Sequence, residues 1–207
     1  MHWGVYLLAA AGVFASCISF YLYKKINKFK ILAIFIASLL FILIVAGMIV
    51  SPIIGEGMGA VIISQITRWA QIFSIAFVLS SLLLFLKNMK PVYGQFTGSY
   101  IVFPFIIVLS YGLVYNSTVL QNFLINIYEA AITIVGLLIF ISYSYNEHRY
   151  FIIFAGTVFF LLSFIINMLL PSYAILEHVL LAVGIVTVLS GFLLVNDYLQ
   201  QTAGETL

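Results

Sequence analysis

Residues 31–50 read ILAIFIASLLFILIVAGMIV, twenty consecutive residues of which none is charged and only Ser38 has a polar side chain. A helix of this length is about 30 Å long, which matches the thickness of the hydrocarbon core of a bilayer. Lipid offers no hydrogen-bond partners, so a chain that crosses it must satisfy its own backbone groups, as a helix does. Polar and apolar residues do not alternate here, so a barrel strand is not indicated. The stretch therefore predicts a transmembrane helix.

Apolar runs of this kind recur along the chain, separated by short polar breaks or breaks that contain Pro and Gly. The pattern predicts an all-α, polytopic membrane helix bundle with about seven transmembrane helices, the fourth being the shortest. We expect one transmembrane domain over residues 1–196 and a short cytoplasmic tail at residues 197–207. The predicted spans cover residues 3–23, 31–50, 64–86, 99–115, 122–143, 150–170 and 172–195.

The composition supports a membrane location. Of 207 residues, 65% are hydrophobic and 7% are charged, whereas a soluble domain has about 25% charged residues. We therefore expect the lipid bilayer to be the main partner and the cell membrane to be the location. No basic patch with interleaved aromatic residues occurs, so nucleic-acid binding is not indicated. Cys17 is the only cysteine, and no Cys/His cluster has metal-ligand spacing, so neither a metal nor another cofactor is expected.

Basic residues fall on one side of the predicted topology. If the chain crosses seven times, only Arg68 lies near the opposite side. Cytoplasmic loops are enriched in Lys and Arg, so the bias predicts that the N-terminus is outside and the C-terminus is cytoplasmic. The residues on the predicted cytoplasmic side are Lys24, Lys25, Lys28, Lys30, Lys87, Lys90 and Arg149.

Ionisable residues within the spans are few, and such residues are costly in a membrane and often functional. At ~1.5 Å per residue, those of the third, fifth and seventh spans all fall in the outer half of the bilayer. Polar residues such as Asn126 and Glu129 share a helix face, and polar faces turn away from lipid. The sequence thus predicts an outward-facing polar cavity between the third, fifth, sixth and seventh spans. Its candidate ligand-binding residues are Arg68, Trp69, Gln71, Asn126, Glu129, Asn167, Glu177 and His178.

The same residues allow other interpretations. Arg68 and Glu129 could form a buried pair that only fixes helix packing. Glu177 and His178 could bind a metal together with Glu129, although one histidine at that depth makes a poor transition-metal site. Glu129 or His178 could be the acid or base of a membrane enzyme, but no nucleophile motif accompanies them. Catalysis is therefore not the favoured hypothesis, and no catalytic residue is assigned.

The favoured hypothesis is a receptor-like or small-ligand-binding membrane protein. It would hold a small polar or amphipathic ligand in the outer cavity and signal through a membrane or cytoplasmic partner protein. The inner half of the spans lacks ionisable residues, which favours a one-sided pocket over a path across the membrane. The alternative is a small transporter or an accessory subunit of a larger membrane complex.

Overall fold

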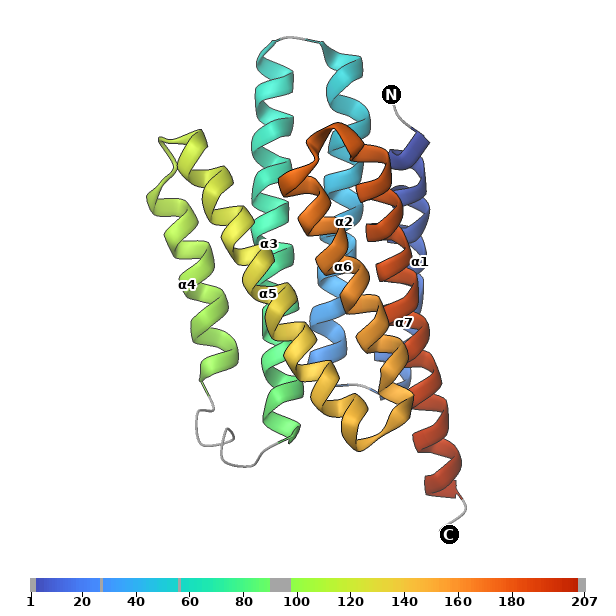
Figure 1. The fold of residues 1–207 in the computed structure, drawn as a ribbon. Coiled ribbons are helices and arrows are strands. Elements are labelled where there is room, and N and C mark those ends of the chain that lie inside the picture. The colour runs from blue at the N-terminus through green and yellow to red at the C-terminus, as the bar shows by residue number, and fades with distance from the viewer. Residues whose placement is uncertain (1–2, 27, 56, 90–97, 205–207) are drawn as a thin grey trace.

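The computed structural model describes residues 3–26, 28–55, 57–89 and 98–204. These residues form an all-α bundle of seven α-helices and two single-turn 3-10 helices, with no strand among them (Figure 1). The α-helices are α1 (Trp3–Ile26), α2 (Phe29–Ile54), α3 (Met58–Met89), α4 (Ser99–Leu113), α5 (Thr118–Asn146), α6 (Phe151–Leu169) and α7 (Ala174–Gly204); the 3-10 helices are η2 (His148–Tyr150) and η3 (Pro171–Tyr173).

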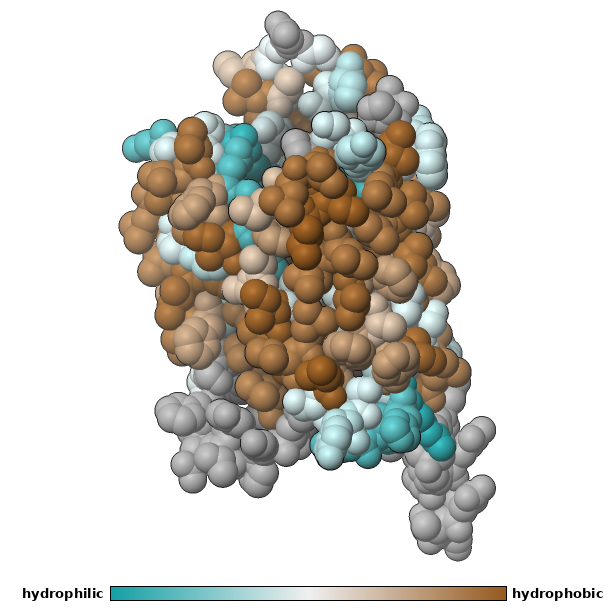
Figure 2. Space-filling view, viewed as in Figure 1, coloured by the Kyte–Doolittle hydropathy of each residue, from teal (hydrophilic) through white to brown (hydrophobic). Residues whose placement is uncertain are grey.

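Within this described part, six helices are long and apolar enough to cross a membrane. The exception is α4, whose 15 residues span roughly 22 Å, less than the ~30 Å hydrocarbon core. It still runs from the end where α3 finishes to the end where α5 begins (Figure 1). Apolar side chains cover the outside, as the brown surface of Figure 2 shows, and Phe105, Leu138 and Leu194 are among those exposed. The chain is therefore a multi-pass membrane protein.

Six helices form a closed ring, and α4 lies outside it. Around the ring, α1 contacts α2, α2 contacts α3, α3 contacts α5, α5 contacts α6, α6 contacts α7, and α7 contacts α1. The remaining helix, α4, packs mainly on the outer side of α3 and touches α5. We call the end at which α1 begins the upper end, and the end toward which α7 finishes the lower end (Figure 1). The charge bias of the sequence predicts that the upper end is outside, and this orientation stays a prediction.

Five helices, α1, α2, α3, α5 and α7, extend beyond the predicted spans at one end or at both. The sequence suggests a loop at Pro52, yet α2 continues to Ile54, because a proline in the last turn removes only one intrahelical hydrogen bond. The helix ends at Gly55, which has a φ of 71°, an angle that residues other than glycine rarely adopt.

The Ser117 side chain accepts a hydrogen bond from the Leu120 N–H, so that α5 begins at Thr118. Residues 197–204 of the predicted tail belong to α7.

Glycines allow α6 and α7 to pack backbone against backbone. A Cβ atom on Gly156 would lie 2.8 Å from the Val188 nitrogen and 3.1 Å from the Gly184 oxygen. A Cβ atom on Gly191 would lie 3.1 Å from the Ile153 nitrogen. Small residues let membrane helices approach closely and associate through van der Waals contacts. This side of the ring therefore has no room for larger side chains at these positions.

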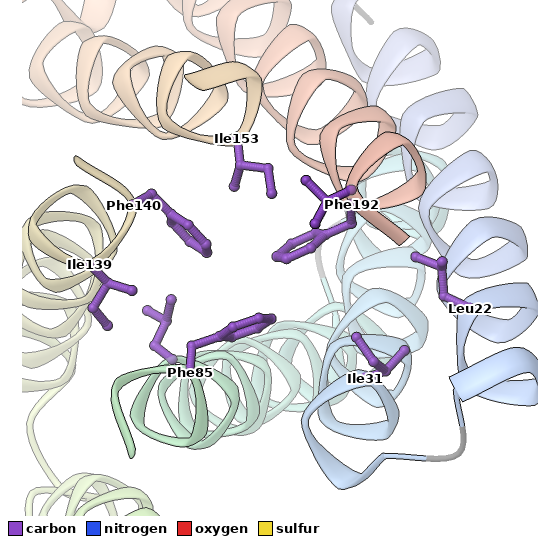
Figure 3. Close-up of a cluster of buried hydrophobic side chains, with 9 residues drawn as sticks. Leu22, Ile31, Phe85, Ile139, Phe140, Ile153 and Phe192 are labelled. Carbon is purple, nitrogen blue, oxygen red and sulfur yellow. The ribbon is translucent and has the colours of Figure 1, made fainter. Parts of the chain in front are cut away.

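Aromatic side chains fill the lower part of the ring. Phe85 of α3, Phe140 of α5 and Phe192 of α7 point toward its centre (Figure 3). The ring centroids are 5.3 Å apart for Phe85 and Phe192, and 5.8 Å apart for each of the other two pairs. The Lys30 ammonium lies 4.1 Å from the Phe85 ring centroid, within the range of a cation–π contact. These three phenylalanines, the aromatic closure, seal the ring at this level.

Candidate ligand-binding site

A cavity of about 280 Å³ extends upward from the aromatic closure inside the ring. All six ring helices contribute to its wall, which is mostly leucine, isoleucine, valine and phenylalanine. Its volume is near the lower limit of ordinary ligand pockets, about 300 Å³. The cavity therefore has room for a small, largely apolar molecule.

Five hydroxyl side chains also line the cavity, and each donates its hydrogen to a backbone carbonyl. The oxygen–oxygen distances lie between 2.7 Å and 3.3 Å. A hydroxyl that has donated its one hydrogen can still accept a hydrogen bond. The wall therefore offers an occupant acceptors rather than donors. The five residues are Ser38, Ser74, Ser81, Thr133 and Thr157.

One helical turn above the cavity-lining residues of α3 and α5, a hydrogen bond joins Gln71 and Glu129, and we call this level the rim. Gln71 precedes the cavity residue Ser74 by three positions, and Glu129 precedes the cavity residue Thr133 by four. Both spacings keep the side chains on the helix face that lines the cavity. The Gln71 Nε2 donates to Glu129 Oε1 over 2.7 Å.

The rim continues on α6 and α7. Glu177 lies one turn above the cavity residue Leu181. Its backbone oxygen accepts a hydrogen bond from Ser163 Oγ over 3.1 Å. The carboxyl groups of Glu177 and Glu129 are close enough to act on each other electrostatically. The rim of the cavity is therefore acidic.

Arg68 does not pair with Glu129, contrary to the pairing that the sequence suggested. Its Nη1 donates to the Gln121 Oε1 over 3.3 Å, whereas the Glu129 carboxylate bonds to Gln71. Gln121 lies two turns above Glu129 on α5, so the long arginine side chain extends toward the upper end. Charged side chains commonly reach toward the membrane surface in this way.

The other predicted site residues lie apart from the rim. Trp69 packs edge-on against Tyr111 of α4, with ring centroids 5.0 Å apart. His178 lies against α1, where a Cβ atom on Gly4 would be 3.0 Å from its Nδ1. Asn126 and Asn167 are exposed. Because α5 crosses the bundle obliquely, its upper part departs from α6, and a hydrophilic strip is visible in this region in Figure 2.

Two buried polar residues, Gln121 and Tyr111, are not among the site residues predicted from the sequence. Both side chains are fully buried, where α3, α4 and α5 meet. Gln121 stands one position before the predicted fifth span, and Tyr111 looks like any other aromatic residue of a membrane helix. Their burial depends on the placement of α4, which no local pattern in the sequence reports.

A larger hollow, of about 540 Å³, lies on the outside of the ring and is bordered mainly by α2 and α3. Its apolar lining side chains include Leu43, Ile62 and Phe73, which are all exposed. Lipid chains are the natural occupants of such a surface. The cavity inside the ring, with the acidic rim above it, is therefore the candidate site.

Comparison with known proteins identifies no family for this chain. No protein-family model, curated protein or solved structure matches the chain. The geometry of the cavity and its rim is accordingly the basis for the function considered next.

Proposed function

We propose that this chain is a receptor-like membrane protein that binds a small amphipathic molecule inside the helix ring. The apolar part of the ligand occupies the cavity, and its polar end lies at the rim formed by Gln71, Glu129 and Glu177. The observation that carries the proposal is the position of this rim, one helical turn above an apolar cavity that is closed below. Under the charge bias, the rim faces the outside of the cell membrane.

The cavity wall selects an apolar ligand body. The hydroxyls of the wall have donated their hydrogens to the backbone, so none of them needs a polar partner. Each methylene group that leaves water for such a cavity contributes about 0.8 kcal/mol. An alkyl or alicyclic body is therefore favoured, and a strongly polar one would lose its hydration without replacement.

The acidic rim selects a ligand end that donates hydrogen bonds. Glu129 Oε1 accepts a hydrogen bond from Gln71, and an ionised carboxylate can only accept and has sites for further donors. Glu177 adds a second carboxyl group nearby. An amine or a hydroxyl fits this environment, whereas a carboxylate or phosphate would be repelled. The ligand class is thus a small amphipath with an amine or hydroxyl end.

The closed lower end favours a receptor over a conduit. The aromatic closure joins α3, α5 and α7 directly below the cavity, so a ligand that moves one of these helices also moves its lower end. The signal would then pass to a partner protein in the membrane or at the cytoplasmic face.

A direct test uses three molecules with the same chain and different ends: octylamine, 1-octanol and octanoate. The thermal unfolding midpoint of the protein in nanodiscs should rise saturably with octylamine and 1-octanol, and octanoate should have no such effect. Glu129→Gln should weaken octylamine binding roughly tenfold, because hydrogen bonds to charged groups exceed neutral ones by about 1 kcal/mol or more. Binding of 1-octanol should change less.

A cavity-filling variant locates the binding. A Cβ atom on Gly136 would lie 3.8 Å from the nearest atom, on Leu82, so a leucine at position 136 would project into the cavity. Gly136→Leu should abolish the octylamine effect. The matched control is Gly112→Leu on the exposed side of α4, where the nearest atom, on Trp69, is also 3.8 Å away. Equal octylamine binding by both variants would place the ligand outside the cavity and contradict the proposal.

Transport of the same ligand is the second candidate, and one observation favours it. The lower end is closed by three aromatic side chains rather than by a hydrogen-bonded polar network, and rotation of such side chains could open a path. Proteoliposomes loaded with buffer should then accumulate octylguanidinium, an analogue that stays charged and keeps its N–H donors, in a manner that Gly136→Leu abolishes. Binding without accumulation supports the receptor.

A further inference from the structure

A second polar site lies outside the ring, where the upper ends of α4 and α5 lie against α3. Gln121 is the fourth residue of α5, and Tyr111 stands two positions before the end of α4. Both are therefore within about one turn of the upper end of their helices. Arg68 reaches this level from α3 through its hydrogen bond to Gln121.

The three side chains have hydrogen-bond donors to spare. Arg68 uses one of its N–H groups on Gln121, and among the described residues no carboxylate pairs with it. The Gln121 Nε2 and the Tyr111 hydroxyl are buried without any hydrogen-bond partner. Both side chains have 0% of their surface exposed. The Tyr111 hydroxyl is near enough to Arg68 to interact with its charge.

Buried hydrogen-bond donors without acceptors destabilise the folded protein, unless a bound group supplies the acceptors. A guanidinium, moreover, stays charged at all accessible pH values. Of the acceptors among the three side chains, Gln121 Oε1 is already used by Arg68, and the Tyr111 hydroxyl oxygen has no hydrogen-bond partner. One neutral hydroxyl cannot balance a guanidinium charge, so a partner that supplies several acceptors and a negative charge would satisfy the site.

We propose that Arg68, Gln121 and Tyr111 bind an anionic oxygen-rich group, a phosphate or a carboxylate, between α3, α4 and α5. Arginine matches the geometry of these anions through parallel N–H groups. The site is separate from the cavity rim, which is acidic and would repel the same group. It also gives α4 a role, because this helix contributes nothing to the ring and yet buries Tyr111 beside α3. The anion is either the headgroup of a lipid or a free ion from the outer aqueous phase.

The test compares three probes on the detergent-purified full chain: dihexanoyl phosphatidylglycerol, inorganic phosphate and dihexanoylglycerol, which has the same acyl chains and no phosphate. The measured quantity is the dissociation constant obtained from the saturable rise in the unfolding midpoint. We expect phosphatidylglycerol to bind and dihexanoylglycerol not to bind. Binding of inorganic phosphate as well would identify a site for free anions; its absence would identify a lipid site.

Two variants identify the residues. Arg68→Gln should weaken binding of the phosphate probe tenfold or more, because it removes a charge-assisted hydrogen bond worth about 1.5–3 kcal/mol. Tyr111→Phe removes a hydroxyl that bonds to nothing in the protein, so the fold should persist while binding weakens several-fold. Its matched control is Tyr115→Phe, one turn further on and exposed, which should leave binding unchanged.

Two results would overturn the proposal. If neither phosphate probe binds, or if dihexanoylglycerol stabilises the protein equally, the buried donors hold water alone. If Arg68→Gln and Tyr111→Phe bind phosphatidylglycerol as the wild type does, the anion is held elsewhere. Neither result bears on octylamine binding in the ring cavity, so the two proposals can fail independently.

Discussion

The two sides of the ring are built differently. Between α6 and α7, glycines bring backbone atoms into contact and leave no room for side chains. Between α3 and α5, long polar side chains form the contacts in the upper half, through Gln71 to Glu129 and Arg68 to Gln121. The helices differ accordingly in direction, because α6 and α7 run side by side while α5 crosses α3 obliquely (Figure 1).

This difference shows where a ligand can act. Backbone packing is rigid, because closely packed helices cannot yield without separating. Side-chain hydrogen bonds can be exchanged for bonds to a ligand at little cost, since each contributes only about 1 kcal/mol net. We therefore infer that the α6–α7 side is the fixed wall of the cavity and that the α3–α5 side is the wall that responds to an occupant.

The largest expected effect is on the fixed wall. Gly156→Leu would drive its side chain into the backbone of α7 at Val188, so the helices must separate. Overpacking of this kind costs about 1–3 kcal/mol and sometimes more, and we expect at least the upper part of that range. Chemical unfolding in mixed micelles measures the loss. A fall of less than about 1 kcal/mol would show that this wall is not rigid.

A smaller effect on the free energy of unfolding is expected on the α3–α5 side, where double-mutant cycles can separate the two polar contacts. The alanine variants of Gln71 and Glu129 should couple by about 0.5–3 kcal/mol, as residues in contact do. The cycle of Arg68 with Glu129 should give less than about 0.5 kcal/mol, because these residues bond to different partners. A larger coupling energy for Arg68 with Glu129 than for Gln71 with Glu129 would support the direct ion pair that the sequence suggested.

The smallest expected effect is that of Ser163→Ala at the α6 end of the rim. Its hydroxyl bonds to the Glu177 backbone oxygen, but glycine packing already holds the two helices together. The free energy of unfolding should fall by about 0.5–1.5 kcal/mol, and the octylamine dissociation constant should not change. A loss of binding as large as that of Glu129→Gln would show that both walls respond to the ligand.

Much of the fold follows from the sequence because the bilayer imposes it. The seven runs, their order and their approximate ends follow from the length of helix needed to cross hydrocarbon, and 31–50 lies within α2. The three rim residues could also be predicted from the sequence, because Gln71, Glu129 and Glu177 are polar residues within apolar runs.

Other features of the site depend on packing and could not be read from the sequence. Helix periodicity places Asn126 on the same face as Glu129, but α5 is oblique and its upper part leaves the ring, so Asn126 is exposed. Gln121 lies outside the predicted span and belongs to α5 because the Ser117 cap starts the helix earlier, and its side chain is fully buried. The apolar cavity could not be predicted from any pattern in the sequence, because it is space that remains between packed side chains.

The most direct measurement of the central claim is to locate a bound amphipath. An octylamine analogue with a diazirine in the middle of its chain, photolysed in nanodiscs, should form adducts with cavity-wall residues such as Val78, Ile132 and Ile185. Excess octylamine should suppress these adducts, and Gly136→Leu should remove them. Adducts confined to lipid-facing residues such as Leu109 and Leu138, unaffected by octylamine, would contradict the claim that the helix ring holds the ligand.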